Sequence, residues 1–104
     1  MNYLTSNLNG IEKKELTSRL LFDIATARNS GYPLIKFILI EGEKNKKDLA
    51  SALRALKKKG KITFFVSSLE FSQESTETEY LFNKFPELKA ESSNDKSTVY
   101  FVKI

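Results

Sequence analysis

The hydrophobic positions of this chain change their spacing several times, and each change predicts a new element. In the first third, apolar residues recur at the spacing of one helix face: Leu16, Leu20, Leu21, Ile24 and Ala27. We therefore predict a helix over Ile11–Ser30, preceded by a short strand within Tyr3–Leu8. Asn9 and Glu12 have the spacing of a capping box at the helix start, and Gly31 indicates its end.

The next apolar run, Leu34–Ile40, is interrupted only by Lys36 and is rich in β-branched residues. This pattern predicts a parallel strand at the centre of a sheet, buried on both faces. Asn45 and Asp48 then open a second helix, and Gly60 closes it. At helical spacing its apolar residues fall on one side, namely Leu49, Ala52, Leu53 and Leu56, and its cations fall on the other, namely Lys46, Lys47, Arg54, Lys57 and Lys58.

Two later segments, Lys61–Val66 and Ser97–Ile104, are rich in β-branched and aromatic residues and are predicted to be strands. Between them, Ser75–Phe85 has the composition of a helix that ends at Pro86. The predicted order is βαβαβ(α)β. We expect a single α/β domain over residues 1–104, built as a two-layer sandwich on a four-stranded mixed sheet.

Composition narrows the possible chemistry. The 104 residues include no Cys and no His, which removes disulfides, thiolate nucleophiles and the usual acid-base group at neutral pH. The chain shows neither a signal-peptide pattern nor an apolar run of about 18 residues for a membrane span. We therefore expect a cytoplasmic protein that does not associate with membranes and has no cofactor.

Positive charge is concentrated in one stretch. Residues 43–61 contain eight Lys or Arg and two Asp or Glu, although the formal charge of the whole chain is only +4. An exposed row of cations neutralises phosphates, which predicts salt-sensitive binding to RNA or DNA through Lys44, Lys46, Lys47, Arg54, Lys57 and Lys58. Lysine is also a good helix former and a normal constituent of a solvated helix face, so both interpretations stay open here.

Polar residues also follow the first two predicted strands. In an α/β sheet the carboxyl ends of parallel strands meet at one edge, so Asn7, Asn9, Glu41 and Glu43 are expected to lie close together. Their oxygens could hold Mg²⁺. Acidic residues before a helix are, however, also stabilised by its dipole, and this explains Glu43 without a metal. We therefore predict no metal site.

The order of elements and the two strand-end turns resemble those of the Smr (small MutS-related) domain family. Ser6-Asn7-Leu8-Asn9-Gly10 stands where that family has an LDLHG-like motif, and Glu41-Gly42-Glu43-Lys44 stands at its HGxG motif. Further similarity lies in Gly60-Lys61-Ile62, in Glu70-Phe71-Ser72, in Phe85-Pro86-Glu87-Leu88-Lys89 and in Lys96-Ser97-Thr98-Val99. The resemblance implies a sheet with two helices on one face and a nucleic-acid surface.

Both family histidines are replaced in this chain, by Asn9 and Glu41, and two glycines are replaced by Lys44 and Lys96. The leading hypothesis is therefore a catalytically degenerate Smr-like module that binds nucleic acid. The second hypothesis is a protein-interaction or self-associating module, because six Glu and two Lys in residues 70–91 form an acidic counterpart to the basic stretch. The third is a metal-dependent endonuclease centred on Glu41 and Glu43.

Overall fold

The computed structural model describes residues 3–40, 46–90 and 97–104. In these ranges the main elements are β1 (Leu4–Asn7), α1 (Lys13–Ser30), β2 (Leu34–Ile40), α2 (Lys46–Lys58), β3 (Phe64–Ser67), α3 (Thr76–Lys84) and β4 (Ser97–Lys103). Short 3₁₀ helices, η1 (Ser68–Glu70) and η2 (Pro86–Ala90), flank α3. The predicted α/β class and element order are confirmed.

The strands form one mixed sheet in the order β1-β2-β4-β3. β1 is parallel to β2, and β4 runs antiparallel to both β2 and β3. In this register Tyr100 of β4 lies between Phe37 of β2 and Ser67 of β3. Because β4 alone is reversed, β1, β2 and β3 all end at the same edge of the sheet, and β2 occupies the predicted central position.

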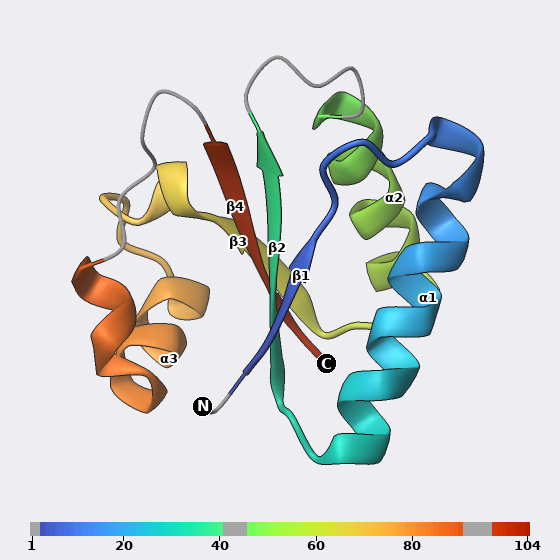
Figure 1. Ribbon diagram of the computed structural model, residues 1–104. Helices are drawn as coiled ribbons and strands as arrows, with labels where there is room; N and C mark the ends of the chain where they lie inside the picture. Colours follow the sequence, from blue (N-terminus) through green and yellow to red (C-terminus); the bar gives the residue numbers. More distant parts are fainter. Residues whose placement is uncertain (1–2, 41–45, 91–96) are drawn as a thin grey trace.

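Helices cover both faces of this sheet. Figure 1 shows α1 and α2 together on one face and α3 on the opposite face. Two helices on one face agree with the prediction, but the sandwich has three layers instead of the predicted two, because α3 and η2 cover the other face. The physical reason lies in β2, whose Leu34 points to the α3 side while Ile35 and Phe37 point to the α1–α2 side, all fully buried.

The two cores differ in composition. The core under α1 and α2 is mostly aliphatic, with Leu16, Leu20, Ile24, Leu49 and Leu53 packed on the sheet. The core under α3 is built on aromatic rings, since Phe71 stacks on Phe101 with ring centroids 5.2 Å apart and meets Phe82 edge-on at 5.0 Å. Such pairs stabilise a core beyond their buried area, which lets a helix as short as α3 stay attached to the sheet.

The helix ends explain two boundaries. Gly31 ends α1 in the left-handed conformation (φ 77°), and the Tyr32 amide donates to the Ala27 carbonyl at 2.8 Å. Gly60 acts in the same way after α2 (φ 75°). The Lys61 amide still donates to the Leu56 carbonyl at 2.9 Å, so β3 begins at Phe64 instead of at the predicted Lys61.

The predicted capping box of Asn9 and Glu12 is wrong. Glu12 is itself the N-cap residue of α1, and its side chain makes no capping hydrogen bond. The Asn9 side chain is used elsewhere, because its Oδ1 accepts a 2.6 Å hydrogen bond from the Ile40 amide at the end of β2. Asn45, predicted to open the second helix, lies outside the described residues.

Candidate nucleic-acid interface

Helix α2 separates its side chains between the core and solvent, as predicted. Leu49, Leu53 and Leu56 are buried against α1 and the sheet. With about 100° per residue, the cations occupy a continuous arc of roughly 120° on the rest of the helix surface. Lys46 in this arc is partly exposed, and the other members are exposed. We call the five cations the basic stripe: Lys46, Lys47, Arg54, Lys57 and Lys58.

The basic stripe has no acidic counterpart within the described ranges. The ion pairs found there join Lys13 to Asp48, Lys14 to Glu12 and Arg19 to Asp23, and none includes a residue of the stripe. Arg54 donates a 3.2 Å hydrogen bond to the Ser51 hydroxyl, which is uncharged. The stripe therefore carries positive charge that the described part of the protein does not neutralise locally.

The stripe also has a definite direction on the molecule. Asp48 of α2 pairs with Lys13 of α1 at 3.7 Å, so the Asp48 side of the helix faces α1. Lys57 lies about 180° from Asp48 around the helix axis. Because α1 is bonded to β1 through Asp23 and Ser6, the side of α2 that carries Lys57 and Arg54 borders the β4–β3 half of the sheet.

Two aromatic rings lie on that half of the sheet. Phe65 of β3 and Tyr100 of β4 are on the face that α1 and α2 cover, with centroids 6.2 Å apart and planes tilted by 52°. Both rings are only partly buried. Sequence analysis did not select either residue. Successive side chains of a strand point to opposite faces of the sheet, so Phe65 and Tyr100 lie on the face opposite to their buried neighbours Val66 and Phe101.

Charges of opposite sign act on the Tyr100 hydroxyl. Burial raises its pKa above the usual 10.0, the Glu70 carboxylate raises it further, and Arg54 of the basic stripe lowers it. The hydroxyl thus lies in the field of a cation on α2 and of an anion on η1. Among the described residues it has no hydrogen-bond partner.

The predicted strand-end cluster is partly visible. Asn7 and Asn9 follow β1, and the Asn9 bond to the Ile40 amide joins the β1 turn to the end of β2. The Asn7 Oδ1 accepts a 2.9 Å hydrogen bond from the Asn9 amide, and Gly10 completes this turn with φ 79°. The amide oxygens of both asparagines are therefore occupied by backbone donors, which favours a structural role for them.

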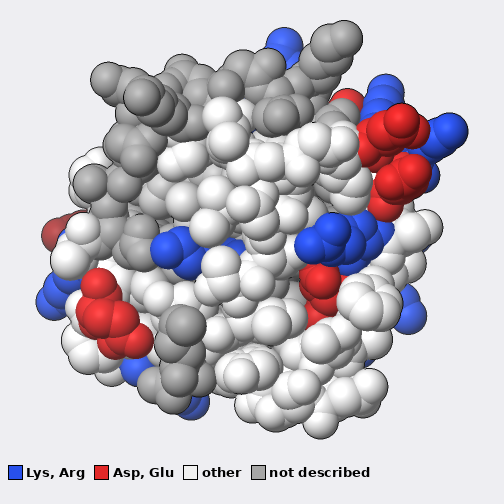
Figure 2. All heavy atoms as spheres, in the orientation of Figure 1, with Lys and Arg blue, Asp and Glu red and all other residues white. Residues whose placement is uncertain are grey.

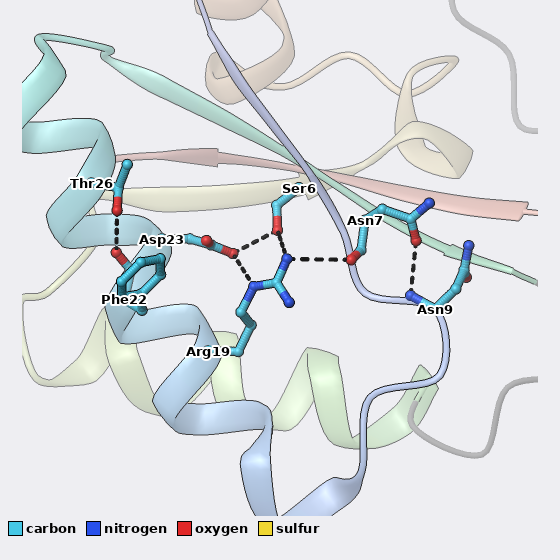
Figure 3. A network of polar contacts seen from close by, with 7 residues as sticks. All are labelled: Ser6, Asn7, Asn9, Arg19, Phe22, Asp23 and Thr26. Carbon is cyan, nitrogen blue, oxygen red and sulfur yellow. Dashed lines mark hydrogen bonds and ion pairs between the residues drawn. The ribbon is translucent and has the colours of Figure 1, made fainter.

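Beside this turn lies a polar network that sequence analysis missed (Figure 3). The Ser6 hydroxyl donates to Asp23 Oδ2 at 2.6 Å, and Arg19 Nε contacts the same oxygen at 3.2 Å. Arg19 Nη2 reaches Ser6 Oγ at 3.3 Å and donates to the Asn7 carbonyl at 3.4 Å. Asp23 is 6% exposed, so these bonds compensate for burying its carboxylate. The sequence did contain a signal for this network: Asp23 is an acidic residue on the apolar face of α1, four residues after Arg19.

The remaining predicted site residues lie outside the described ranges: Glu41, Gly42, Glu43 and Lys44. The structure therefore tests neither the carboxylate pair nor the contribution of Lys44. Within residues 3–40, 46–90 and 97–104, no group of three or more acidic side chains is arranged to hold a metal ion.

Other parts of the surface are less suited to a polyanion. Figure 2 shows the face with β1 in front, where small groups of both charge signs are scattered among uncharged atoms. A hollow of ≈ 560 Å³ beside the start of α3 is lined by Glu74 and Glu79, which repel phosphate. Ser75 and Thr78 in its wall are engaged in the α3 capping box.

Comparisons with known proteins add no assignment: no family model, curated protein or solved structure matches this chain. None of the helices in the described ranges is long and apolar enough to cross a membrane.

Proposed function

We propose that this protein is a nucleic-acid-binding module that contacts the phosphates of RNA or DNA through the basic stripe of α2 and does not cleave the strand. One observation carries the proposal. The five cations share one arc of a single helix, and no described carboxylate lies within ion-pair distance of them. A row of exposed cations of this kind attracts a polyanion and releases its condensed counterions.

The dimensions of α2 suit this role. The helix has 13 residues, which corresponds to a length of about 19 Å. One strand of B-form DNA presents about five or six phosphates over that length. Lysine is a flexible point charge that does not require a fixed phosphate geometry, so the expected binding tolerates many sequences.

A binding role, instead of a nicking role, is supported at the β1–β2 edge. The chain contains no His, and Asn7 and Asn9 use their side-chain oxygens to hold backbone amides. The resemblance to the Smr family stays a prediction, and the basic stripe supports the proposal independently of it. The metal-dependent endonuclease hypothesis depends on Glu41 and Glu43, and it predicts cleavage that requires Mg²⁺ and is lost in Glu41→Ala.

The test compares two variants with equal changes in net charge. The first reverses three stripe cations, Lys47→Glu, Lys57→Glu and Lys58→Glu. The control reverses three exposed lysines elsewhere, Lys14→Glu, Lys84→Glu and Lys89→Glu. Fluorescence anisotropy with labelled single-stranded RNA and duplex DNA, at about 50 mM salt with Mg²⁺, gives the affinity, and a gel of the same samples reports cleavage.

We expect the stripe variant to lose at least about 100-fold in affinity and the control to lose much less. The wild-type samples should show intact strands on the gel. Equal losses of affinity in both variants would show that only the net charge of the protein matters, and would contradict the proposal. Cleavage that requires Mg²⁺ would instead favour the endonuclease hypothesis.

A second candidate function is self-association or docking on a charged protein. It is favoured by one observation: α2 and the acidic α3 segment lie on opposite faces of the sheet (Figure 1). Glu74, Glu79 and Glu87 are exposed on the α3 side, so the basic face of one copy could meet the acidic face of another. Such head-to-tail contacts form a ring where the rotation between copies closes and an open filament where it does not. Sedimentation at low and high salt tests this, since association should disappear as charges are screened.

A further inference from the structure

The aromatic pair next to the basic stripe has no role in the function proposed so far. Phe65 and Tyr100 lie on neighbouring strands, on the same face as α2, and both rings remain partly exposed. The fully buried rings of this sheet, Phe37 and Phe101, are closed over by helices on either side. Each residue of the Phe65–Tyr100 pair therefore keeps some surface that the core does not cover.

We infer that Phe65 and Tyr100 form a base-stacking platform beside the basic stripe, so that the preferred ligand is a single-stranded nucleic acid with accessible bases. This inference deepens the proposed function and rests on it. A duplex keeps its bases stacked inside, whereas a single strand can place bases on aromatic rings while its phosphates follow a row of cations.

The charges around the platform indicate how a strand would lie. Arg54 acts on Tyr100 from α2, and Glu70 acts on it from η1. Phosphates are attracted to the α2 side and repelled from the η1 side. A strand is thus expected to run along α2 with its bases turned over the β4–β3 surface.

The stacking surface is tolerant of sequence, since every base has a π-face. Tyr100 and Phe65 can together carry one or two bases, because their centroids are 6.2 Å apart, nearly twice the rise of about 3.4 Å between stacked bases.

The first experiment separates bases from phosphates. A short single-stranded DNA of thymidines and the same strand made entirely of abasic sites are labelled and titrated at about 50 mM salt. Both strands carry the same number of phosphates. We expect the wild-type protein to bind the thymidine strand about tenfold more tightly than the abasic strand.

The second experiment removes the rings without opening the core. Tyr100→Leu combined with Phe65→Leu keeps apolar side chains at both positions, and Tyr100→Phe serves as the control that keeps the ring. The double variant should bind the thymidine strand no better than the abasic strand, and Tyr100→Phe should keep the preference. Thermal unfolding monitored by circular dichroism verifies that each variant is folded, and a misfolded leucine variant would be replaced by Tyr100→Met.

The outcomes distinguish this inference from the proposed function. Equal binding of the two strands by wild-type protein overturns the stacking platform while leaving phosphate binding intact. The stripe variant is expected to lose binding to both strands, and the leucine variant is expected to lose only the preference for the thymidine strand. This combination supports both the proposed function and the stacking platform. If wild-type protein binds neither of these strands, and neither the RNA nor the duplex DNA used above, the proposed function fails and the platform with it.

A fluorescence measurement supplies an independent readout. The chain has four Tyr and no Trp, so its intrinsic emission comes from tyrosine. Stacking of a base on Tyr100 should quench part of this emission, and the quenching should be smaller in Tyr100→Phe. Equal quenching in both proteins would place the bases elsewhere and contradict the inference.

Discussion

The polar groups of α1 and those of α2 are arranged in opposite ways, although both helices cover the same face of the sheet. Around α1, Arg19, Asp23 and Ser6 bond one another and the β1 backbone. Along α2, the basic stripe has no carboxylate partner among the described residues. The first arrangement satisfies its own charges and stabilises the fold, whereas the second leaves charge available to a ligand.

Under the proposed function, this difference gives the two regions separate roles, which are not the roles that sequence motifs alone would assign to them. The β1–β2 edge carries the motif-equivalent asparagines, yet their side chains hold backbone amides. The stripe and its neighbouring rings match no catalytic motif, yet they have the charge and exposure of a binding surface. Variants at the first region should therefore change stability, and variants at the second should change binding.

The largest effect on stability is expected at Asp23. Asp23→Ala leaves the buried Ser6 hydroxyl and Arg19 without their shared acceptor, and it should lower the free energy of unfolding by about 2 kcal/mol, because Arg19 is itself partly exposed. Urea unfolding measures this loss. Asp23→Asn keeps an acceptor oxygen and should cost less. An unchanged urea midpoint in Asp23→Ala would contradict a stabilising role for the α1 network. Weaker nucleic-acid binding by the folded variant would contradict the separation of that role from binding.

A smaller loss of stability is expected at Asn9. Asn9→Ala removes the acceptor for the Ile40 amide and should cost about 1 kcal/mol. Asn9→Asp is the matched control, because it keeps an oxygen at that position and should retain most of the stability. Urea unfolding again gives the values, and equal losses in both variants would show that the 2.6 Å hydrogen bond is not the cause.

At the binding surface, Glu70→Gln removes the anion that acts on Tyr100. Affinity for single-stranded RNA should rise about two- to threefold at low salt, and the gain should shrink at high salt as charges are screened. Glu87→Gln, on the α3 side, changes net charge equally and should have less effect. Equal gains from both variants would indicate net charge alone.

The smallest effect concerns the alkaline stability of the folded protein. The pKa of Tyr100 is raised from 10.0, mainly by burial, so the folded state disfavours the phenolate. Below about pH 10 the group is protonated in both states and changes nothing, and as pH rises past that value it destabilises the fold. The melting temperature of wild type should therefore fall more steeply than that of Tyr100→Phe between about pH 9 and 11. If the melting temperatures of both proteins fall equally with pH, the buried environment of the Tyr100 hydroxyl is contradicted.

The sequence predicted the elements whose signals are local. The apolar spacing of α1, the amphipathic α2 and the glycine after α1 all gave correct structure, because backbone preference and burial act together there. The Asn9–Glu12 capping box failed because a long-range hydrogen bond to Ile40 competes for the Asn9 side chain. No local signal reveals such a bond.

The candidate site was predicted in part for the same reason. Helical spacing placed the cations of α2 on one side without any knowledge of the fold. The Asp23 network and the position of Tyr100 beside Arg54 depend on which strands are neighbours. That pairing, β1-β2-β4-β3, joins segments distant in the chain and has no signature in residue spacing.

The most direct test of the basic stripe is the salt dependence of its binding. Affinity for single-stranded RNA is measured at several salt concentrations for wild type, for Lys57→Ala with Lys58→Ala, and for the control Lys84→Ala with Lys89→Ala. Five phosphate contacts predict a slope of about −3.5 for log K against log salt, and removal of two contacts reduces its magnitude by about 1.4. The account predicts that reduction for the stripe variant and a wild-type slope for the control. Identical slopes in all three proteins would contradict it.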